Sequence, residues 1–339
     1  MPVIKKPNQH FDINLYTGNS TTNVITNSGS MQPDFVWIKS RSNAQNNDLF
    51  DSVRGAGYAL FSNATNAETN NTANFTSFNS NGFSLASNGG DTNLSGYTYV
   101  GWQWKAGGTA VTNTAGSITS QVSANPTAGF SVVTYTGTGA NATVGHGLGV
   151  APSMVIVKRR PTTGSNWPVW HIGIANTEYL MLNSTNAKTT GLAWWNSTSP
   201  TSTVFSVGSD PDTNGTVAIV AYCFAPVAGY SAFGSYTGNG SANGPFVYTG
   251  FRPKFFMWKR SNTSGNSWLI VDTSRSPTNT AGLYLQPDNT GTEGGGATMD
   301  LLSNGMKIQG DTTASTNGSG DTYIYMAFAE APFKFANAR

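Results

Sequence analysis

One short stretch occurs three times in this chain, and its copies restrict the fold more than any other feature. Each copy is a proline, an apolar run and a basic cluster, and each follows a Tyr-Thr-Gly turn. The copies, called the signature stretches below, are residues 33–41, 152–160 and 253–261. The spacing from the turn tyrosine to the first lysine is the same in each, since 39 − 16, 158 − 135 and 259 − 236 all equal 23. Self-similarity of this kind indicates tandem structural units.

The repeats predict three units of about the size of a small domain. Their expected bounds are 1–108, 109–227 and 228–339 within the 339 residues of the chain. The second unit begins with an uncharged Gly, Thr, Ser and Ala segment that ends at residue 129. A flexible linker and an extended, partly paired connector are both open here, and strand character at 117–122 favours the connector.

Short apolar runs separated by turn residues, without a helical period, indicate an all-β protein. We expect each unit to be a two-sheet β-sandwich of jelly-roll or lectin-like kind. The signature stretch and a long aromatic strand that closes each unit are expected at its centre. The closing strands are expected near 96–105, 217–225 and 322–328.

The composition argues against several classes of function. Only 10% of residues are charged and the net charge is +2, which gives no field suited to nucleic acid. The single cysteine, Cys223, excludes an intramolecular disulfide or a cysteine zinc site, and its apolar flanks predict a buried thiol. The longest apolar run, 217–225, is too short for a membrane helix. We expect a protein that folds in a cytosol without membrane insertion.

The basic clusters are the most regular candidates for an interface. One interpretation is contact with phosphate, an acidic sugar or a neighbouring subunit. The alternative is structural: each strand leaves the core there, or the lysine pairs with Asp51 or Asp272 of its own unit, although His171 stands at that place in the second. The candidates are Lys39, Arg41, Lys158, Arg159, Arg160, Lys259 and Arg260.

Two adjacent indoles, Trp194 and Trp195, have no counterpart in the other units. On a strand they would face opposite sides, so one could be exposed to stack on a sugar or anchor an interface. The alternative is ordinary core packing.

A weak metal candidate is formed by Asp210, Asp212 and Asn214, which match the start of a calcium loop. The twelfth position is Ala221 rather than glutamate, which favours a turn. No Gly-x-Ser-x-Gly elbow is present and no acidic residue recurs at one position of all three units. We therefore expect neither a cofactor nor an enzymatic activity.

The combined pattern resembles repeats in virion structural proteins of tailed bacteriophages, especially marine ones. It consists of the Tyr-Thr-Gly turn, the signature stretch, Ser-Asn-Gly-Phe at 80–83 and the aromatic closing strand. Residues 117–137 resemble the spacer between such repeats. The second unit lacks Ser-Asn-Gly-Phe, and the third has Met306 in place of its phenylalanine.

This resemblance implies a non-enzymatic virion surface protein, either a tail fibre for host adhesion or a capsid decoration. The expected partners are other virion proteins, further copies of this chain and a glycan of the host surface. Two other hypotheses are a carbohydrate-active depolymerase and a structural cement that binds no ligand. The expected location is the virion, assembled in the host cytoplasm.

Overall fold

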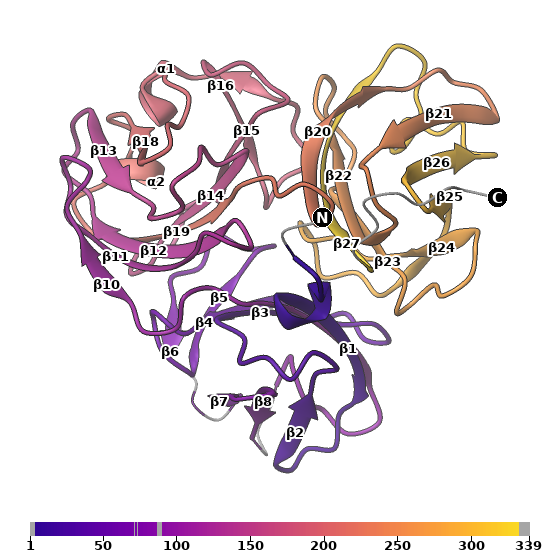
Figure 1. The fold of residues 1–339 in the computed structure, drawn as a ribbon, viewed down its shortest axis with the longest axis horizontal. Helices are drawn as coiled ribbons and strands as arrows, with labels where there is room; N and C mark the ends of the chain where they lie inside the picture. Colours follow the sequence, from indigo (N-terminus) through magenta and orange to yellow (C-terminus); the bar gives the residue numbers. More distant parts are fainter. Residues whose placement is uncertain (1–3, 71, 73, 87–89, 332–339) are drawn as a thin grey trace.

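The computed structural model describes residues 4–70, 72, 74–86 and 90–331. These residues form an all-β protein, which confirms the predicted fold class. The strands gather in three lobes around a common centre (Figure 1). We call residues 11–104, 111–224 and 231–329 the first, second and third lobes. Each lobe has an inner sheet, which faces the centre, and a smaller or equal outer sheet.

The first lobe follows a short 3-10 turn, η1 (Pro7–Gln9). Its inner sheet has the order β1 (Phe11–Thr17), β9 (Thr98–Trp104), β3 (Phe35–Ser40), β4 (Asn47–Asp51), β5 (Tyr58–Phe61) and β6 (Thr69–Asn70). Its outer sheet has the order β2 (Asn23–Thr26), β8 (Gly82–Leu85) and β7 (Phe75–Asn79).

The second lobe has the largest sheet and both α-helices. Its inner sheet has the order β10 (Val111–Asn113), β11 (Ser120–Asn125), β12 (Phe130–Thr136), β19 (Ala218–Phe224), β14 (Met154–Arg159), β15 (Pro168–His171), β16 (Glu178–Met181) and β17 (Thr189–Thr190). Its outer layer contains β13 (Ala142–Gly145), β18 (Val204–Val207), α1 (Leu192–Trp195) and α2 (Pro211–Asn214). In the segment before β12, β10 and β11 pair in antiparallel fashion and extend the inner sheet.

The third lobe has two sheets of four strands. The inner sheet has the order β20 (Ser231–Thr237), β27 (Thr322–Ala329), β22 (Pro253–Arg260) and β23 (Leu269–Asp272). The outer sheet has the order β21 (Asn243–Tyr248), β26 (Gly305–Gln309), β25 (Gly294–Leu302) and β24 (Ala281–Tyr284).

The signature strands β3, β14 and β22 each pair with the closing strand of their lobe, and both strands lie in the interior of the inner sheet. The second residue after each signature proline pairs with an aromatic residue of the closing strand: Phe35 with Trp104, Met154 with Phe224 and Phe255 with Phe328. All six residues of β3 are buried, because one face of the strand contacts the outer sheet and the other contacts the centre. A strand buried on both faces needs a continuous apolar run, which explains why the signature does not alternate.

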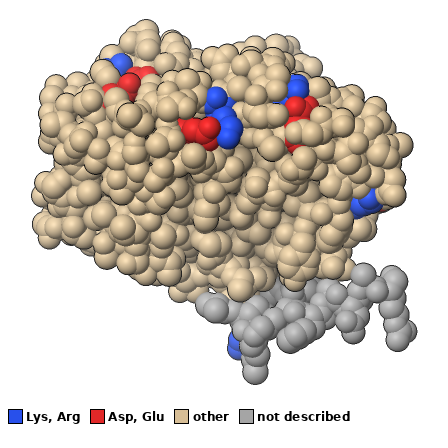
Figure 2. All heavy atoms as spheres, turned by 90° about the horizontal axis from the view of Figure 1, so that it is seen from above, with Lys and Arg blue, Asp and Glu red and all other residues tan. Residues whose placement is uncertain are grey.

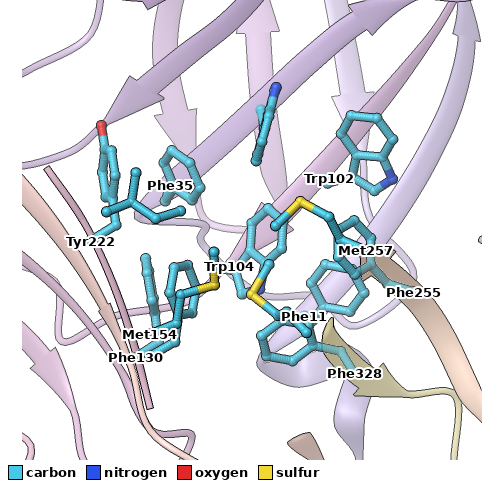
Figure 3. Packing of buried hydrophobic residues seen from close by; sticks show 14 of the residues in the cluster. Phe11, Phe35, Trp102, Trp104, Phe130, Met154, Tyr222, Phe255, Met257 and Phe328 are labelled. Carbon is cyan, nitrogen blue, oxygen red and sulfur yellow. The ribbon is translucent and has the colours of Figure 1, made fainter. Parts of the chain in front are cut away.

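The largest hydrophobic core lies between the lobes rather than within one of them (Figure 3). Trp104, Phe224 and Phe328 form a triangle there, with ring centroids 5.7 to 6.2 Å apart. Each lobe has in addition its own core between its inner and outer sheets. Within the described part of the chain, no helix is long and apolar enough to cross a membrane.

Candidate functional site

The lysines of the three signature stretches are buried where one lobe meets the next. Lys39 donates to the carbonyl oxygens of Gln45, at 2.8 Å, and of Thr290 in the third lobe, at 3.1 Å. Lys259 donates in the same way to Thr185 of the second lobe, at 3.3 Å, and Lys158 donates to Ser165. Burial lowers the pKa of each of the three ammonium groups to about 8. These side chains hold loops in place and do not reach an external ligand.

The lysines do not form the ion pairs that were an alternative for them. Asp51 pairs instead with Arg54, and Asp272 with Arg275 at 2.6 Å, both pairs being fully buried. Each aspartate pairs with an arginine because the arginine stands three residues later in the chain. Its planar guanidinium group reaches the carboxylate and also donates to a backbone carbonyl.

The buried ion pairs extend into two larger networks, one between the first and second lobes and one between the first and third. Glu68 contacts Arg54 of its own lobe and Arg160 of the second lobe, at 2.9 and 2.8 Å. Glu293 of the third lobe contacts Arg275 and, in the first lobe, Arg41, at 3.2 and 2.8 Å. The predicted candidates Arg41 and Arg160 thus serve contacts between lobes.

The boundary between the second and third lobes has no such network among the described residues. Lys188 occupies the place of Glu68 and Glu293, since its N–H likewise donates across the boundary, to the oxygen of Ser261. His171 occupies the place of Asp51 and is buried, with Nε2 3.1 Å from the oxygen of Tyr325. Burial lowers the pKa of His171 to about 4, so the imidazole is neutral.

The remaining basic candidates are paired within their own lobes. Arg159 contacts Asp212 at 3.2 Å, and Arg260 contacts Asp321 at 2.7 Å. The weak metal candidates belong to α2, where the Asp210 carboxylate caps the N–H of Asp212 and the Asn214 amide donates to Gly208. No group of three metal-ligating side chains occurs in the described residues.

The two adjacent tryptophans lie on α1 and not on the strand that was expected. Trp195 is 2% exposed and belongs to the core of the second lobe. Trp194 is partly buried and stacks on Tyr179, with ring centroids 4.2 Å apart and an interplanar angle of 23°. Both indoles are therefore mainly packing groups, and the exposed apolar side chain of α1 is Leu192.

A recess in the third lobe remains as the candidate site. It has a volume of about 350 Å³ and opens between the inner and outer sheets. Its lining includes Tyr284 at the end of β24 and residues of the loop 311–316 between β26 and β27. Gly295 and Gly296 of β25 also line it. A volume of this size lies in the range of small-molecule sites.

Polar side chains dominate the lining of this recess. Asn266 and Ser267 precede β23, and Gln286 follows β24. The oxygen of Asn266 accepts from Arg260 at 2.9 Å, and that of Gln286 accepts from Asn289 at 2.8 Å. Among the described residues, neither amide donates a hydrogen bond from its NH2 group. Asp311 is the one charged side chain that lines the recess.

The sequence predictions did not include this recess. Its one visible signal is the tract Gly294-Gly295-Gly296, which has no counterpart at the corresponding places of the other lobes. A Cβ at position 294 would lie 2.4 Å from the Tyr284 ring, so glycine there lets the ring lie against the backbone.

A family model described as a domain of unknown function, DUF7483, matches residues 6–332. No curated protein and no solved structure matches the chain.

Proposed function

We propose that this chain, which belongs to the DUF7483 family, is a non-enzymatic virion surface protein of a tailed bacteriophage. It acts in host adhesion as part of a tail fibre, or in capsid decoration, through many contacts with protein partners and with glycans. The observation that carries the binding role is the open recess of the third lobe, in which amide and hydroxyl groups surround one tyrosine ring. Weak sites of this kind gain strength when an assembly presents many copies.

The lining of the recess favours binding over hydrolysis. Glycoside hydrolysis generally uses two carboxyl groups on opposite sides of the scissile bond. Asp311 is the one acidic residue that lines the recess, and its carboxylate accepts the N–H of Thr313 at 2.7 Å. A binding protein requires only the hydrogen-bonding groups and the ring.

The virion location rests on the resemblance of the repeats, and the surface chemistry agrees with it. The face seen in Figure 2 shows few charged residues, grouped as mixed acidic and basic clusters on an otherwise uncharged surface. Such a surface suits contacts with neutral neighbours, including other virion proteins and further copies of this chain. The face in this view shows no basic patch of the kind that binds nucleic acid.

Two experiments test the proposal. Antibody labelling of intact particles in the electron microscope should place the protein on a tail fibre or over the head, and its absence from particles would contradict the virion location. Host polysaccharide incubated with the purified protein should keep its original length. Release of oligosaccharides would replace the binding role by that of a depolymerase. A protein that covers the head and binds no glycan would be a structural cement.

A further inference from the structure

We propose that the recess of the third lobe binds one ring of a neutral sugar, stacked face to face on Tyr284. This inference rests on the proposed binding function and names the ligand class and the central contact. The second lobe supplies the main observation, because the recess beside its equivalent tyrosine is smaller, with a volume of about 140 Å³ against about 350 Å³ in the third lobe.

Tyr284 and Tyr179 occupy equivalent positions in the two lobes. Leu180, which follows Tyr179, pairs with Val169 on β15, and Leu285, which follows Tyr284, pairs with Ile270 on β23. In both lobes the tyrosine therefore directly precedes the residue that pairs with the inner sheet, although Tyr179 lies near the start of β16 and Tyr284 ends β24. Tyr179 is covered by the indole of Trp194, whereas the ring of Tyr284 forms a wall of the recess.

The loop that lines the recess also has an equivalent in the second lobe. In the second lobe, the loop after β18 is held by α1, since Gly208 and Thr213 both donate to the oxygen of Trp194 at 3.0 Å. The corresponding loop of the third lobe, 311–316, lines the recess. In the second lobe the indole of Trp194 thus stacks on the tyrosine while its backbone oxygen holds the loop, whereas none of the described residues stacks a ring on Tyr284 in the third.

The segment that carries Trp194 in the second lobe is shorter in the third, which explains why the recess is larger there. Lys188 and Glu293 are equivalent, because each N–H donates to a signature stretch of the neighbouring lobe. Phe205 and Met306 are equivalent, because each pairs with the edge strand of the outer layer. In the second lobe the segment between these two positions spans 205 − 188 = 17 residues and forms α1. In the third it spans 306 − 293 = 13 residues and forms a glycine-rich strand without an indole.

The chemistry of the lining selects the ligand class. The apolar face of a sugar ring packs on an aromatic ring, and its hydroxyl groups match the amide NH2 groups of Asn266 and Gln286. The recess has no lysine or arginine in its lining and has Asp311, which disfavours phosphates, uronic acids and other anions. An aromatic or aliphatic ligand would leave the polar lining without hydrogen bonds.

The test uses purified full-length protein and a panel of neutral oligosaccharides ending in glucose, galactose, mannose or N-acetylhexosamine. Saturation-transfer NMR identifies binders and shows which sugar protons contact the protein, and titration calorimetry gives the dissociation constant. We expect at least one panel member to bind, with the strongest saturation on the protons of one face of a single ring.

Three variants make the test specific for the recess. Tyr284→Ala should weaken binding tenfold or more. Gln286→Ala should weaken it severalfold, because the substitution removes one amide NH2 group of the lining. Tyr179→Ala removes the equivalent ring of the second lobe and should leave the dissociation constant unchanged. Far-ultraviolet circular dichroism and melting temperature establish that each variant is folded.

Absence of binding by every panel member would overturn the inference, as would binding that survives both Tyr284→Ala and Gln286→Ala. Preference for an acidic sugar or for a peptide would overturn the ligand class. None of these results affects antibody labelling of the particle, which tests the proposed function separately. Conversely, oligosaccharide release by a protein whose binding depends on Tyr284 would overturn the non-enzymatic function and leave the site standing.

Discussion

Replacing Lys39 by methionine should change how the stability of the protein depends on pH. Lys39 is fully buried, and its pKa is lowered to about 8 from 10.5 because burial disfavours the ammonium form. Between these two values the unfolded chain binds more protons at this residue than the folded chain does. The free energy of unfolding of the wild type therefore rises as the pH increases through this interval. Methionine fills a similar volume and does not titrate.

The magnitude follows from the two pKa values. A tenfold change in proton affinity corresponds to about 1.4 kcal/mol, so lowering the pKa from 10.5 to about 8 amounts to about 3 kcal/mol in full. About 2.5 kcal/mol of this is expected between pH 7 and pH 10, since both forms are partly titrated at the ends of the interval. The wild type should gain this much stability relative to Lys39→Met over that range.

Chemical denaturation at pH 7 and pH 10 measures the effect as the difference between wild type and variant. Tyrosines and Cys223 titrate in both proteins and cancel from this difference. Lys158→Met and Lys259→Met provide two further measurements, because burial lowers the pKa of those lysines to about 8 as well. A difference between wild type and Lys39→Met that stays constant with pH would refute the reasoning.

Three further predictions concern the lobe boundaries and the core. Glu68→Gln and Glu293→Gln should each lower the free energy of unfolding by about 2 kcal/mol, because each glutamate bridges two arginines, whereas Lys188→Gln at the equivalent, more exposed position should change it by less than about 0.5 kcal/mol. Equal effects in denaturation experiments would contradict the assignment of the networks. The pKa of His171, lowered to about 4 from 6.5, means that the wild type should lose about 3 kcal/mol of stability as the pH falls from 7 to 4, and His171→Gln should not show that loss. The thiol of Cys223 is buried and its pKa is raised by burial, so it should react with Ellman's reagent only after unfolding; rapid reaction of the native protein would show that the core opens readily.

The sequence was a good guide wherever a pattern recurred. The equal spacing of the signature stretches and their unbroken apolar runs predicted strands at the centre of each sandwich, and β3, β14 and β22 are such strands. An apolar run without alternation also signals burial on both faces. The run could not reveal which part of the chain packs on the second face. In β3 this face contacts other lobes rather than another part of the same sandwich.

Residues whose role depends on distant parts of the chain were beyond prediction. The basic clusters look like solvent-facing strand ends, yet Lys39 is fully buried, and its ammonium group donates a hydrogen bond to the carbonyl oxygen of Thr290, 251 residues away. Trp194 was considered as a strand residue, but it lies on α1, and contacts of α1 with the loop 208–213 stabilise this short helix. The recess around Tyr284 exists because the third lobe has a glycine-rich strand where the second has α1 and Trp194. This difference appears only when the two lobes are compared in three dimensions.

The triangle of Trp104, Phe224 and Phe328 has a consequence for how the molecule folds. These residues are 224 − 104 = 120 and 328 − 224 = 104 positions apart, and their rings are in contact at one point. No lobe can bury its inner face until the other two have formed and docked. The chain should therefore melt in one cooperative transition instead of three, and it should fold slowly, because its largest core depends on the most distant contacts in the sequence.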